Sequence, residues 1–436
     1  MAAVGGVARA TVERRPVTDR PPGLLGNAVR ASVAGFSTLL LAVLLVIAGR
    51  LLGEEEYGKF SFALALVMIF ETVIDFGLKE ITTREVARDR RAAQALVSQT
   101  FGLKLALSAV ASAGLLVAAN LLRPEPEVRL VCYVLGAASI LRSYLLTLRY
   151  TLQGIERFGL DGIVVGVDRL LLLVIGVGAL VGGFGVIGLA VAFVGARVIS
   201  LSVACALAVL QIGPFRPAFD GARWLELQRR ALPFGAFVAV LYLYSYADTV
   251  MLGVIRGDEE TGLYNAAYRV YEGLANVGHV LQTVLIPRLS RYSATSRTGH
   301  AQLARRGLLA GGLLALPTAA AGYVLAGPVV ILLFGQDYGT AGGVLQLLAA
   351  GLVVVFPLCV LHGVALSVGA GGWLLRTAVI GCVFNVGLNL VLIPRFGMQG
   401  AAAATVAGEA LSVMVLAWGL RRWLWPISGP GAPPPQ

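Results

Sequence analysis

The chain has 436 residues, of which only 14% are Asp, Glu, Lys or Arg, against roughly a quarter in soluble domains. The hydrophobic set AVILMFWYC makes up 57%, which excludes a water-soluble globule and a disordered chain alike. The net charge of +11 would suggest nucleic-acid binding in a soluble protein, but basic cytoplasmic loops account for it in a membrane protein.

Two polar tails flank the apolar part of the chain. Residues 1–26 predict a disordered basic cytoplasmic tail, and residues 425–436 predict a second disordered tail. The apolar runs between them lack period-2 alternation, so they predict helices rather than barrel strands. We expect an all-α polytopic membrane protein with twelve transmembrane helices, at approximately 29–52, 57–78, 101–122, 128–152, 160–180, 186–210, 232–255, 261–287, 305–325, 341–368, 373–393 and 398–420.

Two sequence stretches recur in the two halves of the chain. Gly53–Ala63 aligns with Gly257–Ala267 at an offset of 204, with five identities in eleven positions. Phe184–Ser200 aligns with Phe396–Ser412 at an offset of 212, with seven identities in seventeen. Local turn chemistry explains the residue types, because Gly ends one helix and acidic residues open the next. It does not explain two matches at nearly equal offsets, which favour a duplicated six-helix unit.

The duplication predicts two six-helix lobes, at residues 27–210 and 232–424, joined by a cytoplasmic linker at residues 211–231. Because six is an even number, both lobes have the same orientation, and transporters built from such parallel repeats place their substrate between the halves. With the N-terminus inside, 25 of the 35 Lys and Arg residues fall in cytoplasmic segments and 6 in outer loops. Both termini are therefore predicted to be cytoplasmic.

Several motifs carry a family resemblance. The stretch LLGEEEYGKFSFALALV, followed by DFGLKEITTREVAR, resembles the opening hairpin of the polysaccharide-biosynthesis flippases of the multidrug/oligosaccharidyl-lipid/polysaccharide exporter superfamily. YSYADTVMLG with GLYNAAYRV, and NLVLIPRFGMQGAA, are similar to that family's seventh, eighth, eleventh and twelfth spans. The resemblance covers almost all of Asn27–Trp425. It implies a two-lobed transporter that moves polyprenyl-diphosphate-linked oligosaccharide across the inner membrane, with that lipid and the bilayer as its partners.

Polar side chains recur along the eighth predicted helix at steps of 4, 3, 4 and 3 residues: Asn265, Arg269, Glu272, Asn276 and His279. This spacing puts them on one helix face, which must meet protein or water rather than lipid. One interpretation is the lining of a cavity. The other is a helix–helix seam in which Arg269 and Glu272 pair at i,i+3.

Ionisable groups near the bilayer midplane cost a few kcal/mol, so deep Arg residues are functional candidates. Arg142 lies ~15 Å from the cytoplasmic end of its helix, too far to snorkel, and Arg169 and Arg197 are comparably deep. Arg suits a diphosphate because its fork binds phosphate bidentately and stays charged. The predicted substrate-binding residues are Arg30, Arg142, Arg169, Arg269, Asn265 and Asn276. For each lone Arg, a structural ion pair is the alternative.

Embedded acids are candidates for coupling transport to an inward flow of H⁺ or Na⁺. We select Asp75, Asp248 and Glu272; Asp248 forms a cluster with Ser245 and Thr249 at i,i+3 and i,i+4 spacing. The four cysteines lie in apolar runs without CxxC spacing, so the sequence predicts no metal site and no cofactor.

Three rival functions remain. One is a peptidoglycan-precursor flippase, although that branch typically has fourteen spans. A multidrug–cation antiporter of the same superfamily would prefer an acid-lined site, which the deep Arg residues disfavour. A membrane polysaccharide polymerase or ligase would need a sizeable outer loop with catalytic groups, but the longest outer segment, residues 327–340, carries only Asp337 as a charge. The sequence also lacks the GxxxxGK[ST], HExxH and GxSxG motifs, so we expect a transporter rather than an enzyme.

Overall fold

The computed structural model describes the backbone of residues 24–425 and the side chains of residues 39–425, so the two predicted tails lie almost wholly outside the described residues. The described chain is helical and contains no strand. Its helices are α1 (Leu24–Asp75), α2 (Leu78–Arg88), α3 (Ala93–Leu122), α4 (Pro126–Gly154), α5 (Phe158–Val181), α6 (Gly185–Ile212), α7 (Gly221–Ile255), α8 (Asp258–Thr295), α9 (Arg297–Val324), α10 (Ala326–Phe334), α11 (Ala341–Ser367), α12 (Gly371–Gly419) and α13 (Arg421–Leu424), with short 3-10 helices η1 (Arg90–Ala92) and η2 (Gln336–Thr340).

The number of membrane spans agrees with the prediction. Within the described residues, nine helical segments are long and apolar enough to cross a membrane. Two of them supply two spans each, because the helix is broken at Gly53 inside α1 and at Gly397 inside α12. α8 is long enough but more polar, and it brings the number to twelve. The predicted all-α, twelve-helix fold is confirmed.

The internal repeat is visible in the backbone. Gly53 and Gly257 both have positive φ, 77° and 95°, at the turns that precede the second and eighth spans. Gly185 and Gly397 both have positive φ, 59° and 54°, at the start of the sixth and twelfth spans. Side chains other than Gly rarely adopt this conformation. Matched conformations at both sequence offsets support a duplicated unit over independent turn chemistry.

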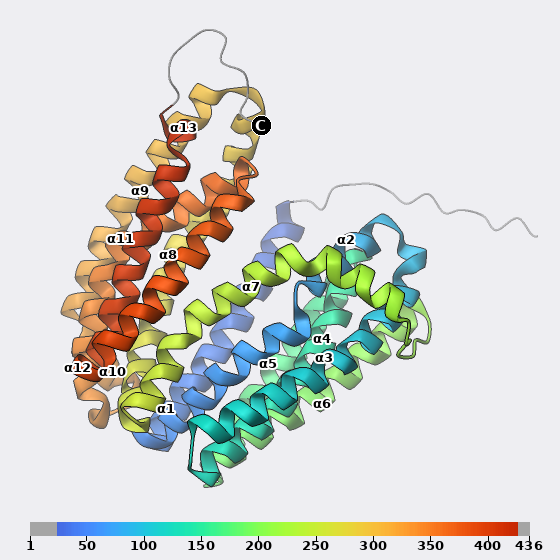
Figure 1. Cartoon of the computed structure of the whole chain (residues 1–436), viewed down its shortest axis with the longest axis horizontal. Helices are drawn as coiled ribbons and strands as arrows, with labels where there is room; N and C mark the ends of the chain where they lie inside the picture. Colours follow the sequence, from blue (N-terminus) through green and yellow to red (C-terminus); the bar gives the residue numbers. More distant parts are fainter. Residues whose placement is uncertain (1–23, 426–436) are drawn as a thin grey trace, which may run out of the picture.

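Figure 1 shows two helical bundles that diverge from a shared end, where the turns at Gly53 and Gly257 lie. We call α1–α6 the N-terminal lobe and α8–α13 the C-terminal lobe. α7 bridges them: Trp224 and Leu227 near its start pack on α2 and α3 of the N-terminal lobe, while its later turns contact α12. Only residues 213–220 of the predicted linker lack helical structure, since α7 already begins at Gly221. The domain boundaries themselves stay a prediction.

At the shared end, the two lobes cross at a pair of glycines related by the repeat. A Cβ on Gly58 would lie 1.8 Å from the carbonyl oxygen of Asp258, and a Cβ on Gly262 would lie 1.9 Å from the carbonyl oxygen of Glu54. The four positions correspond at the offset of 204, so the contact is reciprocal, like the self-complementary contact about a two-fold axis. α1 and α8 approach this closely because neither glycine carries a side chain.

Hydrogen bonds also join the two lobes at the end where the glycines cross. Arg123, in the α3–α4 connection, donates to both carboxylate oxygens of Asp258 at 2.8 and 2.6 Å and to the carbonyl oxygen of Gly253 at 3.1 Å. From the other lobe, the Tyr338 hydroxyl donates to the carbonyl oxygen of Gly49 at 2.8 Å. We call this end, with its glycine crossing and these bonds, the sealed end.

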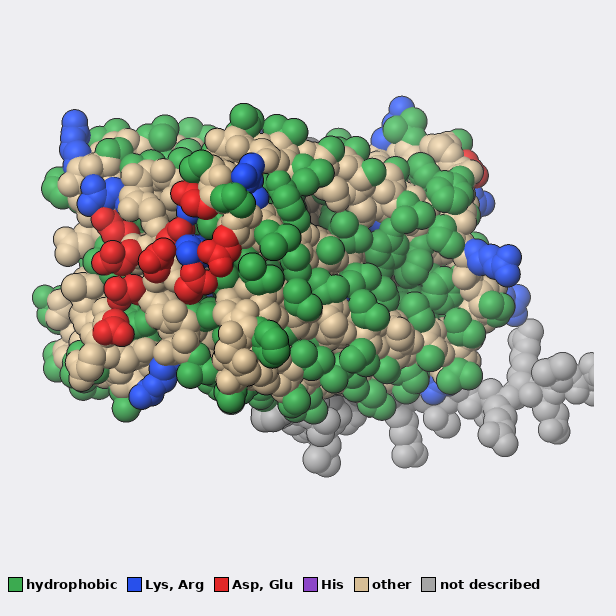
Figure 2. All heavy atoms as spheres, turned by 90° about the horizontal axis from the view of Figure 1, so that it is seen from below, with side chains coloured by type: hydrophobic (Ala, Val, Ile, Leu, Met, Phe, Trp, Pro, Cys, Tyr) green, Lys and Arg blue, Asp and Glu red, His purple; other side chains and the backbone are tan. Residues whose placement is uncertain are grey.

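The distribution of side chains on the surface is that of a protein embedded in a membrane. Hydrophobic side chains cover much of the flank, whereas Asp and Glu side chains gather towards one end (Figure 2). Both repeated turns at the sealed end are acidic, with Glu54, Glu55 and Glu56 in one lobe and Asp258, Glu259 and Glu260 in the other. Basic residues are concentrated in the segments predicted to be cytoplasmic, so this pattern is consistent with a sealed end that faces outward.

Candidate functional site

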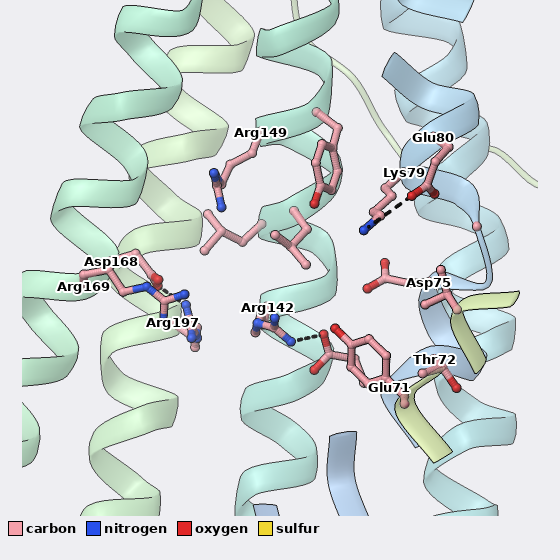
Figure 3. A pocket seen from close by; sticks show the side chains of 16 residues that line it. Glu71, Thr72, Asp75, Lys79, Glu80, Arg142, Arg149, Asp168, Arg169 and Arg197 are labelled. Carbon is pink, nitrogen blue, oxygen red and sulfur yellow. Dashed lines mark hydrogen bonds and ion pairs between the residues drawn. The ribbon is translucent and has the colours of Figure 1, made fainter. Parts of the chain in front are cut away.

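A cavity made of two pockets is lined mainly by the N-terminal lobe, with α7 forming its other wall and Arg269 of α8 as the one lining residue from the C-terminal lobe. The pockets hold about 830 and 750 Å³ of empty space, which includes open solvent at their mouths, and they share four lining residues: Arg142, Arg169, Arg197 and Tyr242. The shared residues join the pockets into one cavity, and we call the three shared arginines the arginine junction. The first pocket, seen in Figure 3, extends away from the sealed end to the α1–α2 turn, and we call it the inner pocket. The second runs toward the sealed end and is called the deep pocket.

Three neighbouring helices supply the arginines of the junction. Arg142 comes from α4, Arg169 from α5 and Arg197 from α6, and Figure 3 shows Arg169 and Arg197 beside Asp168, with Arg142 pointing to Glu71. Arg149 follows Arg142 by seven residues, two helical turns, so both lie on one face of α4 and line the inner pocket. All three junction arginines lie within membrane-spanning helices, where a cation needs a carboxylate, water or an anionic ligand.

Five of the six cations that line the cavity have a carboxylate partner. Arg142 pairs with Glu71, and Arg197 pairs with Asp168. The other three pairs are Arg149 Nε with Asp161 Oδ1 at 2.7 Å, Arg269 Nη1 with Glu272 Oε2 at 2.6 Å, and Lys79 Nζ with Glu80 Oε1 at 3.4 Å. These pairs cancel most of the positive charge in the cavity.

Arg169 is the exception. It forms no ion pair or hydrogen bond with any residue that the structure describes, and its buried Nε lacks an acceptor. The neighbouring Asp168 is already engaged by Arg197. An unpaired buried charge costs several kcal/mol, and in a cavity this cost is offset when an anion binds. Arg269, in the deep pocket, also has a buried Nε without an acceptor.

The structure brings three of the predicted substrate-binding residues together. Arg142, Arg169 and Arg269 all line the deep pocket, and the first two also line the inner pocket. Both interpretations of the α8 stripe hold in part, because Arg269 pairs with Glu272 and also lines the cavity. Arg30 belongs to α1, but its side chain lies outside the described residues.

The two predicted asparagines lie elsewhere. Asn265 is buried among α7 and α8 residues, where its Nδ2 donates to the carbonyl oxygen of Thr261 at 2.9 Å and its Oδ1 accepts from Thr249 at 3.3 Å. Asn276 is exposed. Neither is among the residues that line the cavity.

The three predicted ion-coupling acids have different surroundings. Asp75 pairs with the buried Lys104 and accepts from Ser143 at 2.8 Å, and Glu272 pairs with Arg269. Asp248 is 4% exposed and pairs with no basic side chain that the structure describes. Its oxygens accept from Asn389 at 2.5 Å, Thr405 at 2.5 Å and Tyr264 at 3.1 Å.

Several site residues were not assigned from the sequence. Arg197 is recognisably deep, but its partner Asp168 sits on the preceding helix, and only tertiary packing shows that contact. Tyr242 and Tyr246 line the cavity opposite the N-terminal lobe. Their i,i+4 spacing on the seventh span was a usable signal, since it places two amphipathic rings on one face of an apolar helix.

Twelve helices in two repeated lobes, with an arginine-lined cavity between the N-terminal lobe and α7, define a polytopic membrane protein with a transporter fold. The chain belongs to the family of polysaccharide biosynthesis proteins, whose sequence profile it matches over residues 24–293. The profile of the MatE family matches residues 233–391. The resemblance drawn from the sequence motifs is therefore confirmed.

Two curated relatives are named as flippases. The chain is 30% identical over 172 residues to the probable flippase AglR of Haloferax volcanii, and 26% identical over 176 residues to the probable low-salt glycan biosynthesis flippase Agl15 of the same organism. These matches cover 38% and 40% of this chain. They span only 36% and 37% of the relatives, little more than a third of their length.

Solved structures share the fold over most of the chain. The lipid II flippase MurJ in an inward closed conformation matches with a TM-score of 0.76 at 13% identity, covering 90% of this chain and 87% of that one. A multidrug resistance MATE family transporter of the MOP superfamily matches in its inward-facing conformation with a TM-score of 0.73 at 17% identity, covering 91% and 98%. An outward-facing conformation of such a transporter gives only 0.58. These likenesses show the shared fold.

Proposed function

We propose that the protein is a flippase that moves a polyprenyl-diphosphate-linked oligosaccharide from the cytoplasmic to the outer leaflet of the inner membrane. Both termini are cytoplasmic in this proposal, and the sealed end faces outward. The family membership and the names of the two relatives support the substrate class. The protein performs no chemistry on the lipid and acts by alternating access.

The unpaired Arg169 at the arginine junction is the observation that carries the proposal. A sugar diphosphate is anionic and strongly hydrated, so it cannot cross hydrocarbon unaided. Two phosphates need several donors in fixed geometry, and Arg169 and Arg269 line one cavity, each with a buried Nε that lacks an acceptor. The membrane potential assists outward movement, by ~2.3 kcal/mol per negative charge per 100 mV.

In this proposal, the two ends of the molecule open in turn during the transport cycle. The sealed end blocks the outer side, while the inner pocket extends toward the segments predicted to be cytoplasmic. The substrate enters from the cytoplasm in this state, with its polyprenyl tail left in the bilayer. Opening of the sealed end then releases the head group outside.

We further assign Asp248 as the ion-coupling residue in preference to Asp75 and Glu272, which already have basic partners. Between α7 and α12, Asp248 accepts from the Thr405 hydroxyl and from the Nδ2 of Asn389, and the Oδ1 of Asn389 lacks a hydrogen-bond partner. Oxygen ligands of this kind suit a hard cation such as Na⁺, and the carboxylate alternatively takes up H⁺.

Replacing Asp248 with Asn should remove the dependence of transport on an ion gradient. The measurement compares lipid transfer in proteoliposomes with and without an inward Na⁺ gradient or H⁺ gradient. Wild-type protein should be accelerated by one of the two, and the Asp248→Asn protein by neither. Asp337→Asn, which removes an exposed carboxylate, is the control and should keep the acceleration. An Asp248→Asn protein that responds normally would contradict the assignment.

The second candidate function is a multidrug–cation antiporter. The MatE match over residues 233–391 favours it, but the cavity argues against it because the unpaired group in the junction is a cation. A cationic drug would be repelled where an anionic head group is attracted.

Lipid transfer in proteoliposomes separates the two functions. Purified protein is reconstituted with a fluorescent short-chain polyprenyl-diphosphate oligosaccharide, and a membrane-impermeant quencher reports the leaflet that the lipid occupies. A cationic dye is tested in parallel as the antiporter substrate. We expect transfer of the lipid and none of the dye. Dye transport without lipid transfer would favour the antiporter.

A further inference from the structure

The two pockets of the cavity differ in chemistry. The deep pocket is lined largely by apolar side chains, among them Leu41, Leu45, Leu64, Val67, Leu135 and Phe193. The inner pocket is lined mainly by charged and polar groups from α1, α2 and α4, together with Tyr150 and Tyr242. The arginine junction lies between them, so an anion bound there has a polar chamber on one side and an apolar one on the other.

The inner pocket keeps several hydrogen-bonding groups free. The hydroxyls of Tyr150 and Tyr242 make no hydrogen bond with the described residues, and the Oε2 of Glu80 is buried without a partner. Carboxylate oxygens and hydroxyls of this kind accept from, or donate to, the hydroxyls of a carbohydrate. Buried acceptors left unpaired cost free energy, which a ligand's hydroxyl groups recover.

Aromatic rings complete the pocket. Tyr242 belongs to both pockets, which places its ring beside the anion site, and Tyr150 lines the inner pocket farther from the sealed end. Lys79 covers one face of Tyr150, with Nζ 5.8 Å from the ring centroid. A sugar ring has an apolar face of C–H groups and a polar edge, so it is bound by an aromatic face flanked by hydrogen-bonding groups.

We propose that the inner pocket is a carbohydrate subsite that binds the sugar directly attached to the diphosphate, with Tyr242 as the residue that recognises its ring. This inference rests on the proposed function, because the diphosphate at the arginine junction sets the position of that sugar. The apolar deep pocket offers too few partners for sugar hydroxyls, so the sugar lies on the inner side. Tyr242 thus determines specificity for the head group, while Arg169 binds the diphosphate that every substrate shares.

Binding of matched probes to the purified full-length protein tests the proposal. The sugar-free probe is farnesyl diphosphate, and the sugar-bearing probes carry one hexose, one N-acetylhexosamine or one 6-deoxyhexose on the same lipid diphosphate. Wild-type protein should bind at least one sugar-bearing probe more tightly than the sugar-free probe. Tyr242→Leu should lower the preference for that probe over farnesyl diphosphate, measured as the ratio of the two affinities, about five- to tenfold. Tyr242→Phe keeps the ring and should lose about threefold or less.

Two further variants separate loss of sugar recognition from a general loss of binding. Tyr323→Leu removes an exposed tyrosine of α9 that lies outside both pockets, and it should bind every probe like the wild type. Arg169→Gln should weaken all probes together. The carbohydrate subsite is refuted if no sugar improves binding, or if Tyr242→Leu weakens both kinds of probe equally or neither. Failure of the wild type to bind any lipid diphosphate would instead refute the proposed function.

Discussion

Replacing Arg169 with Gln is expected to weaken binding of a lipid diphosphate about 10- to 100-fold and to stop its transfer, while the protein remains folded. Arg169 is the cavity cation without a carboxylate partner among the described residues, so its removal leaves no buried acid uncompensated. A hydrogen bond to a charged group contributes about 1.5–3 kcal/mol, which corresponds to the expected loss of affinity. Arg169→Lys keeps the charge without the bidentate fork and should lie in between.

Arg197 provides the matched contrast, because it lines the same junction but is paired with Asp168. Arg197→Gln leaves a buried carboxylate alone and should destabilise the protein by about 3–5 kcal/mol. Thermal denaturation in detergent measures this loss, and lipid binding is measured in the same preparations. An Arg169→Gln protein that unfolds as easily as Arg197→Gln, or that binds the lipid normally, would contradict the assignment of Arg169 to the substrate.

Replacing Gly58 with Ala should open the sealed end. The new Cβ would lie 1.8 Å from the carbonyl oxygen of Asp258, a distance at which backbone must move. Overpacking of this kind costs about 1–3 kcal/mol, and the cost falls only on the state in which α1 and α8 cross. The population should therefore shift toward the state that is closed on the cytoplasmic side.

Spin labels placed on cysteines at Arg157 and Ala294 report this shift. Both positions are exposed, one in the α4–α5 turn of the N-terminal lobe and the other near the end of α8. Their separation should shorten in the Gly58→Ala protein. Gly273→Ala is the control, because this α8 glycine has nothing within 4 Å of an added Cβ, and the distance should stay unchanged. Equal distances in all three proteins would show that the glycine crossing does not hold the sealed end.

The fold was largely predictable from the sequence because each long apolar run indicates a helix that crosses the bilayer. The sixth span was predicted at 186–210, and α6 covers Gly185–Ile212. Where the boundaries differ, the helix continues beyond the membrane: the ninth span was predicted from residue 305, but α9 begins at Arg297, where Ser296 caps it. A hydropathy pattern locates the part in lipid, whereas capping groups decide where the helix itself starts.

The site was less predictable, because its chemistry depends on contacts between helices. Depth identified Arg142 and Arg169, and the polar stripe on the eighth helix identified Arg269, but neither signal could show which of these arginines had partners. Arg142 meets Glu71 from α1, 71 residues away, and Asp168 turns from its neighbour Arg169 to Arg197 on α6. Asn276 was assigned from the helical stripe, which correctly describes one face of α8 but not how far along that face the cavity extends.

The most direct test of the cationic cavity is an experimental structure of the full-length protein with a bound polyprenyl diphosphate. We expect phosphate density at the arginine junction, within hydrogen-bond distance of Arg169, with the lipid chain leaving toward the bilayer. Density for the diphosphate elsewhere, with the Arg169 guanidinium still unpaired in an empty junction, would contradict it.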